Sequence, residues 1–423
     1  MENKLPNNWV KVNLKEVVSY KKGKKPKILK DEFFEDSVPY LDIMAFEKGV
    51  VRRYADVESS NLIEDKSIGI VWDGARSGWV SMGQNGAVGS TIAILKPFAI
   101  EPVYLYRFLQ SNFNFLNTNT RGTGIPHVDP QILWNIKFPL APLKEQQRIT
   151  KKLDSLFSQL DDVKLRLEKI PELLKNFRQA ILNEAYQTNF DRVTLDDVCL
   201  KIQDGAHHSP KKQYAENDGS KFLYITSKNI RNNYMNLSKI VYVDKEFHDS
   251  IYSRCKPEFG DVLLTKDGAN TGNVTLNTLK EPFSLLSSVC LIKTNKEKLI
   301  PSYLKYFIQS PIGFKELIGE MSGTAIKRIV LRKIKKATIP LPLIEEQNKI
   351  IKRIEDSFSK VDLIETQYEA LKEKMVTLPQ SILHKAFKGE LVEQLPTDGD
   401  AKELLKQINK LKEEINKKGK KKK

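Results

Sequence analysis

The residue types that most often carry catalysis are sparse in this sequence and lack catalytic spacing. The five histidines form no metal-ligand pattern, and His207-His208 is more simply a loop pair than a metal site. The three cysteines are odd in number and lack zinc-type spacing, which argues against a zinc site and a disulfide framework. The triplet Glu64-Asp65-Lys66 matches half of a nuclease motif, but so short a match is expected by chance. We therefore expect no metal site and no catalytic centre.

Charge indicates a polyanionic partner instead. The 69 basic and 53 acidic side chains leave a formal net charge of +16, a balance typical of proteins that neutralise phosphates. The segment 417–423 carries six lysines that alone would form a solvated tail, and without them the charge is still +10 (16 minus 6). Basic charge does not by itself separate nucleic acid from acidic lipid or an acidic protein.

No feature of the sequence indicates a membrane or an exported protein. No apolar run approaches the ~18 residues that a transmembrane helix needs. The first residues contain neither a basic nor an apolar leader region. We expect a cytoplasmic protein.

Two Asp-Gly turns carry polar side chains that differ between them. Residues 73–78 (Asp-Gly-Ala-Arg-Ser-Gly) correspond to residues 267–272 (Asp-Gly-Ala-Asn-Thr-Gly). Each follows an apolar run, so a tight turn is its simplest role. The fourth and fifth positions differ, Arg-Ser against Asn-Thr, while the frame is shared, as expected of a DNA-reading loop that is used twice.

A second pair of loops has the same character. Residues 122–127 (Gly-Thr-Gly-Ile-Pro-His) parallel residues 323–328 (Gly-Thr-Ala-Ile-Lys-Arg). Both could be ordinary solvated connections, but both place hydroxyl, histidine or cationic groups at one point, which suits phosphates and base edges, and we favour DNA contact. The lysine-rich run 21–27 and the segment 203–212 occupy equivalent places after a first strand, although each alone would pass as a solvated loop.

The candidate DNA-binding residues come from these loops and from polar positions near them. They are Lys24, Lys25, Arg76, Ser77, Arg121, Thr123, His127, His207, His208, Lys211, Lys228, Asn229, Lys266, Asn270, Thr271, Thr324, Lys327 and Arg328.

An internal repeat organises the elements that must position these loops. The segment 138–149 returns as 339–350, shifted by 201 positions, and the shift holds without a gap to about residue 185. Upstream the correspondence continues with small changes of offset, as expected where loops vary between two copies of one fold. We interpret the chain as a duplication.

The ungapped parts of the repeat carry a heptad pattern typical of a coiled coil. We expect kinks at Pro171 and Pro379, since an interior proline disrupts a helix and the heptad pattern stays in phase across both. The two helices are expected to pair with each other, antiparallel. The predicted seam is Leu153, Leu156, Leu160, Val163 and Leu167 in the first copy, and Ile354, Val361, Ile364, Tyr368 and Leu371 in the second.

The segments before the helices differ from them, with short β-rich runs separated by Gly, Asn, Asp and Pro turns. We expect an α+β protein: domains at 1–143 and 188–343, long helices at 144–187 and 344–395, and a C-terminal helix with a basic tail at 396–423.

This layout resembles the specificity subunit of type I restriction-modification systems over almost the whole chain. The Pro-Leu-x-x-x-x-Glu-Gln starts of the helices (139–146 and 340–347), the paired Gly-Thr loops and the segment 380–391 carry the resemblance. The last element is weaker in the first copy, where Ala185-Tyr186-Gln187 has no following glycine.

The resemblance implies two target recognition domains that each read one half of a bipartite sequence in double-stranded DNA. The helices would set the unread spacer and dock two adenine methyltransferase subunits, joined by restriction/translocase subunits. It also implies that S-adenosylmethionine, ATP and Mg belong to those partners. The chain agrees, since it has neither an Asn-Pro-Pro-Tyr adenine pocket nor a Gly-x-x-x-x-Gly-Lys-Ser/Thr phosphate loop.

Two other classes of function remain open from the residues alone. One is a stand-alone nuclease or methyltransferase whose motifs have drifted. The other is a coiled-coil scaffold without a DNA role, for which DNA retention would not collapse steeply with salt.

Overall fold

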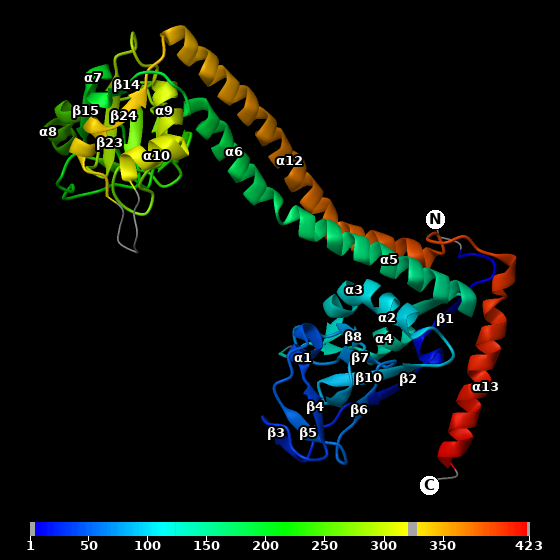
Figure 1. The fold of residues 1–423 in the computed structure, drawn as a ribbon. Coiled ribbons are helices and arrows are strands. Elements are labelled where there is room, and N and C mark those ends of the chain that lie inside the picture. The colour runs from blue at the N-terminus through cyan, green and yellow to red at the C-terminus, as the bar shows by residue number, and fades with distance from the viewer. Residues whose placement is uncertain (1–4, 123, 320–327, 421–423) are drawn as a thin grey trace. The chain divides into compact units, whose positions relative to one another are not determined.

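The computed structural model describes residues 5–122, 124–319 and 328–420. The chain divides into two compact units (Figure 1): residues 1–167 with 371–423, and residues 168–370. Helix α12 (Ile344–Lys388) contributes to both. The units therefore do not follow the expected contiguous domains, because the last turns of the second long helix pack with the first unit.

The first unit is built on a four-stranded antiparallel sheet in the order β2-β10-β7-β8. A five-stranded sheet of short strands, β3-β5-β4-β9-β6, lies beside it, and β1 pairs with β13. Its strands are β1 (Val10–Asn13), β2 (Val18–Lys22), β3 (Leu29–Lys30), β4 (Ser37–Leu41), β5 (Tyr54–Asp56), β6 (Leu62–Ile63), β7 (Ile68–Val71), β8 (Val80–Met82), β9 (Gly86–Val88), β10 (Ile92–Pro97), β11 (Thr120–Arg121), β12 (His127–Val128) and β13 (Lys137–Leu140). Its helices before the long helix are α1 (Ile43–Lys48), α2 (Pro102–Ser111), α3 (Phe113–Thr118) and α4 (Pro130–Asn135).

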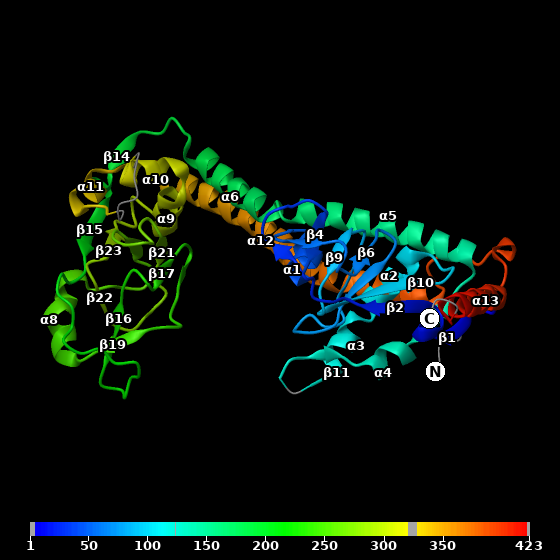
Figure 2. The same cartoon turned by 90° about the horizontal axis from the view of Figure 1, so that it is seen from below.

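The second unit has a four-stranded antiparallel sheet of the corresponding order, β15-β23-β20-β21, and β14 pairs with β24. A three-stranded sheet, β19-β16-β22, carries α8 (Figure 2). Its strands are β14 (Arg192–Thr194), β15 (Cys199–Asp204), β16 (Phe222–Ile225), β17 (Ile230–Arg231), β18 (Tyr234–Met235), β19 (Val241–Val243), β20 (Val262–Thr265), β21 (Val274–Leu276), β22 (Phe283–Leu285), β23 (Val289–Thr294) and β24 (Thr338–Pro340). Its short helices are α7 (Leu195–Val198), α8 (Lys245–Cys255), α9 (Pro301–Gln309), α10 (Pro311–Ile318) and α11 (Leu331–Lys336).

The repeated Glu-Gln motif fastens a long helix to the domain before it. Gln146 is fully buried, its Oε1 accepts the Glu101 amide at 2.9 Å, and its Nε2 donates to the Ala141 carbonyl at 2.7 Å. Gln347 repeats this with the Ile300 amide (2.9 Å) and the Pro342 carbonyl (2.9 Å). Each glutamine satisfies backbone groups that burial would otherwise leave unpaired.

The first long helix is two helices, α5 (Leu143–Leu167) and α6 (Ile170–Tyr186), because Pro171 takes the early position at which proline begins a new helix. Pro379, by contrast, lies inside the continuous α12. The predicted seam is unevenly covered: Leu153, Leu167, Ile354 and Val361 are buried, Leu156, Leu160 and Tyr368 are partly buried, and Val163, Ile364 and Leu371 are exposed.

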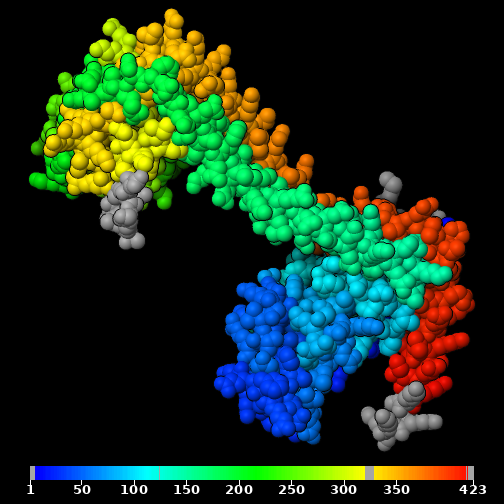
Figure 3. All heavy atoms as spheres, viewed as in Figure 1, coloured from blue at the N-terminus to red at the C-terminus, as the bar shows by residue number. Residues whose placement is uncertain are grey.

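Residues 389–420, which we call the C-terminal arm, pack against the rest of the first unit. Helix α13 (Ala401–Lys420) inserts Leu404 and Ile408 into the same core as Trp9, and it lies along this unit (Figure 3). Arg148 of α5 forms a bidentate ion pair with the buried Asp398 just before α13. In the described part of the chain, no helix is both long enough and apolar enough to cross a membrane.

Candidate nucleic-acid interface

The two Asp-Gly turns have the same backbone hydrogen bonds. In the first unit the Ser77 amide donates to the Gly74 carbonyl (2.9 Å) and the Gly78 amide to Val71 (2.8 Å). In the second unit, Thr271 donates to Gly268 (3.1 Å) and Gly272 to Thr265 (2.9 Å). Gly74 and Gly268 both have φ +104°, a region that favours glycine. The sequence motif thus encodes one loop geometry, used twice.

The residue that ends each predicted Gly-Thr loop, His127 or Arg328, pairs with the start of the Asp-Gly turn. His127 forms an antiparallel bridge with Asp73, and Arg328 forms one with Asp267. The next amides continue the pairing: Val128 donates to the Trp72 carbonyl (2.8 Å), and Ile329 to the Lys266 carbonyl (2.7 Å). In each unit, therefore, His127-Val128 or Arg328-Ile329 meets an Asp-Gly turn far away in sequence, at the end of a central strand.

In the first unit, Asp73 binds two cationic or titratable side chains. Its Oδ1 lies 2.7 Å from His127 Nδ1, and its Oδ2 lies 3.6 Å from Lys22 Nζ at the end of β2. We call Lys22, Asp73 and His127 the first corner. Next to it, Tyr20 and Trp134 pack on Trp72 with ring centroids 5.4 and 6.3 Å away.

The second unit has different side chains at the equivalent places. Asp204 ends β15 as Lys22 ends β2, and Lys266 follows β20 as Trp72 follows β7. Lys266 Nζ is 3.2 Å from Asp204 Oδ2, and Arg328 Nε is 3.8 Å from Asp267 Oδ2. We call Asp204, Lys266, Asp267 and Arg328, with the flanking His207 and Arg254, the second corner.

Asp204 is the shared anion of the second corner. Arg254 Nη2 donates to its Oδ1 at 2.8 Å, and His207 Nε2 lies 3.2 Å from its Oδ2. Burial alone raises the pKa of the Asp204 carboxyl, but Arg254, Lys266 and His207 outweigh it and hold that pKa below its usual value. One carboxylate serves three basic side chains, so the corner has an excess of positive charge.

The structure separates the candidate DNA-binding residues by exposure. Those exposed are Lys24, Lys25, Arg76, Arg121, His207, His208, Lys211, Lys228 and Arg328. Those partly exposed are His127, Asn270 and Thr271. Thr123, Thr324 and Lys327 lie outside the described residues.

Three candidates are buried, which does not fit the expected direct DNA contact. Ser77 is fully covered, Asn229 hydrogen-bonds Thr226 and Asn236 within its own loop, and Lys266 is 3% exposed. The side chains of Asn229 and Lys266 support their loops from within, whereas the Ser77 hydroxyl is buried without a hydrogen-bond partner. Sequence reasoning could not see this, because polarity in a loop does not reveal which side chain turns inward.

Sequence reasoning also missed the acidic members of the corners. The sequence pattern marks Asp73 and Asp267 only as turn formers, although their duplication at the same place in the two copies was a usable signal. Asp204 and Arg254 meet across 50 residues, and nothing in their local sequence indicates the contact.

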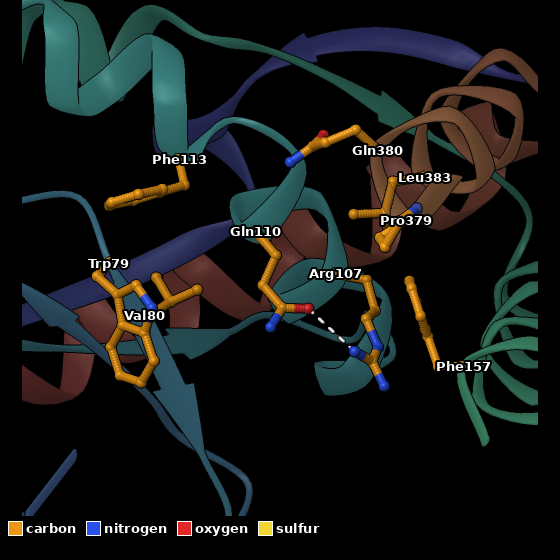
Figure 4. Close-up of a pocket in the computed structure, with 9 residues that line it drawn as sticks. All are labelled: Trp79, Val80, Arg107, Gln110, Phe113, Phe157, Pro379, Gln380 and Leu383. Atoms are coloured by element: carbon orange, nitrogen blue, oxygen red, sulfur yellow. Dashed lines mark hydrogen bonds between the residues drawn. The ribbon is translucent and has the colours of Figure 1, made fainter. Parts of the chain in front are cut away.

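A cavity of about 260 Å³ lies in the first unit among α2, α3, α5 and the end of α12 (Figure 4). Arg107 borders it, donating to Gln110 (3.0 Å) and pairing with Asp154 (3.0 Å). Aromatic and aliphatic side chains form most of the wall, namely Trp79, Val80, Phe113, Phe157, Pro379 and Leu383. The lining has no nucleophile or acid–base pair. Among the described residues, no three histidine, cysteine or carboxylate side chains gather as a metal site requires.

Comparison with known proteins identifies the family. The sequence model of the type I restriction modification DNA specificity domain matches twice, at residues 6–172 and 187–373. The MjaVIII specificity subunit of Methanocaldococcus jannaschii is 28% identical over 407 residues, covering 89% of this chain and 92% of that protein. The EcoKI specificity subunit of Escherichia coli K12 is 26% identical over 428 residues, covering 92% and 91%.

The fold also has a solved counterpart. The crystal structure of the HsdS subunit from Thermoanaerobacter tengcongensis superposes with a TM-score of 0.63 at 20% identity, covering 92% of this chain and 99% of that one. The expected mixture of helices and strands in two domains with long helices is confirmed. The chain belongs to the type I restriction-modification specificity subunits, the family that its loops and helices resemble.

Proposed function

We propose that the first and second corners each read one half of a bipartite DNA target. The observation that carries this is the pair of strand-end loops, which share every backbone hydrogen bond compared above but present different cations. A fixed frame with exchanged side chains is what two readers of different sequences need. The exposed lysines beside the corners would supply contacts to phosphates.

We further propose that α5 and α6 pair with α12 as an antiparallel coiled coil. In the first unit Phe157 and Leu383 line one cavity, and in the second unit Arg178 of α6 pairs with Asp362 and Glu365 of α12. From Phe157 to Arg178 the residue number rises along the first copy, while that of the contacted residue in α12 falls from 383 to 362–365, as antiparallel helices require.

The same helices would dock two methyltransferase subunits, joined by restriction/translocase subunits. Apolar side chains that the chain itself leaves exposed on them support this, since such patches mark interaction sites. They are Val163, Leu165, Leu173, Phe177, Leu363, Ile364, Leu371, Val376 and Leu378.

In this account the chain acts on DNA in the cytoplasm without a catalytic centre. S-adenosylmethionine, ATP and Mg would be bound by the partner subunits. The family relation speaks against the scaffold and the stand-alone enzyme as alternatives.

Exchange of residues 1–143 for the corresponding domain of another specificity subunit tests the proposal. The methylated sequence should change in one half only. An insertion in α5 should change the spacer and leave both halves as they were. A swap that changes both halves, or neither, would refute the two-reader account.

A further inference from the structure

The equivalent positions of the two corners hold a histidine in one and an arginine in the other. His127 and Arg328 occupy the same bridge position, and each lies beside the aspartate that begins the Asp-Gly turn. An arginine is charged throughout the physiological range, whereas imidazole is the side chain whose charge ordinarily changes between pH 5 and 8. The charge at this bridge position can therefore depend on pH in the first unit but not in the second.

Asp73 determines which atom of His127 remains available. A carboxylate only accepts hydrogen bonds, so the nitrogen 2.7 Å away, Nδ1, carries a hydrogen. The other nitrogen, Nε2, is then an acceptor in the neutral ring and a donor in the cation. The ring is 40% exposed, so a ligand can approach it.

Among the described residues, charged groups near this ring come from the loop after β7, from β2 and from β11. Asp73 approaches from the loop after β7, and Lys22 approaches the same carboxylate from β2. Arg121 lies opposite His127 in the β11–β12 pair. Protonation of the ring therefore adds a positive charge to a place that already holds two cationic side chains and one carboxylate.

Resting on the DNA-reading role proposed above, we propose that His127, positioned by Asp73, is a proton-dependent contact to the first half-site. The protonated ring donates from Nε2 to an acceptor oxygen or nitrogen of the DNA, either on a phosphate or on a guanine edge. The neutral ring loses that donor. Arg328 keeps its donors in the second half-site at every pH in this range.

Affinity measured against pH tests the proposal. The full chain, purified with the subunits that accompany it, is titrated from pH 5.5 to 8.5 at fixed salt against a duplex that keeps the first half-site and has the second scrambled. Affinity should fall on the order of tenfold as pH rises, since a charge-assisted hydrogen bond is lost. A flat curve would overturn the proposal.

Matched variants separate this histidine from His207 and His208. His127→Arg should keep the low-pH affinity up to pH 8.5, and His127→Gln should show the high-pH affinity throughout. Asp73→Asn should weaken the response, because the ring loses the group that orients it. Arg328→His should add a pH response on a duplex with only the second half-site, beyond the wild-type baseline. A response that persists in both His127 variants would contradict the proposal.

Two further measurements identify the acceptor on the DNA and distinguish failure of this proposal from failure of the DNA-reading function. If the acceptor is a phosphate, the pH response survives when the bases of the first half-site are changed, and if it is guanine, the response disappears with that base. Both outcomes support the protonation-dependent contact. If neither half-site binds in a salt-dependent manner at any pH, it is the DNA-reading function itself that fails.

Discussion

The two corners share a backbone and differ in their electrostatics. The first places a single carboxylate, Asp73, between Lys22 and His127 at the surface. The second buries Asp204 with Lys266 and surrounds that pair with Arg254 and His207. The loop hydrogen bonds are the same in both. A duplicated frame can therefore keep its geometry while the charges within it are rearranged, which is how one fold can hold two readers.

The units differ in a second way, at the start of their long helices. Glu145 is fully buried and accepts hydrogen bonds from Trp9 Nε1 (2.9 Å) and Gln394 Nε2 (3.1 Å), so it joins the chain's beginning to the C-terminal arm. Its counterpart Glu346 pairs only with its helix neighbour Lys349 among the described contacts. The same motif residue has a tertiary role in one unit and a local one in the other.

The largest expected effect distinguishes the buried carboxylate from the exposed one. Asp204→Ala leaves Lys266 buried without its anion and should cost about 3–5 kcal/mol of stability, whereas Asp73→Ala should cost at most about 1 kcal/mol because its partners are half exposed. Urea unfolding can be followed by circular dichroism for both units and by fluorescence for the first, which holds all four tryptophans, Trp9, Trp72, Trp79 and Trp134. Asp204→Ala should shift the unfolding seen by circular dichroism and leave the tryptophan fluorescence transition unchanged. Equal losses of stability in the two variants would contradict the claim that the two corners arrange their charges differently.

Acid unfolding sharpens the same contrast. The pKa of Asp204 is lower in the folded chain, so its contribution is present above the ordinary aspartate value of about 3.9 and is lost as pH falls toward the folded value. Asp204→Asn should therefore flatten the loss of second-unit stability as pH falls below about 4. An unchanged acid profile would mean that the carboxylate is not held ionised by its neighbours.

A smaller effect is expected where the two glutamates differ. Glu145→Ala removes the acceptor of Trp9 and should cost about 2–3 kcal/mol, because a buried indole N–H is left unsatisfied. Glu346→Ala, the matched control, should stay within about 0.5 kcal/mol. Tryptophan fluorescence during unfolding measures the first directly. Similar losses for both would indicate that the C-terminal arm contributes nothing through Glu145.

The smallest effect should be equal in both units. The Tyr104 hydroxyl donates to the Pro139 carbonyl at 2.8 Å, and the Tyr303 hydroxyl donates to the Pro340 carbonyl at 3.0 Å, both fully buried. Changing either to phenylalanine should cost about 1 kcal/mol. Thermal unfolding of the two variants checks this, and a large difference would show that the cores are less alike than their hydrogen bonds.

Local patterns in the sequence predict the repeated parts of this molecule well. The Asp-Gly turns need glycine at a positive φ, and the Glu-Gln motif needs a glutamine whose amide reaches two backbone groups, so both leave a signature of residue type. Pro171 likewise marks where the first long helix is disturbed, although the sequence predicts a kink there and the structure has two separate helices.

Features that depend on distant partners could not be predicted. Arg254 reaches Asp204 from helix α8, which packs on the three-stranded sheet, and Ser77 is fully buried in the folded unit. The heptad pattern predicts a seam, but not that Val163, Ile364 and Leu371 are exposed in the chain alone. Periodicity marks an apolar stripe and does not say whether the chain or a partner covers it.

The central claim is that the two corners read separate halves of one target. Mapping methylated adenines in DNA from cells that carry the wild-type chain or Arg328→Ala tests it most directly. The account predicts a bipartite motif for the wild type, and for the variant a relaxed base preference in one half with the other half and the spacer unchanged. A continuous motif, or a variant that alters both halves, would contradict it.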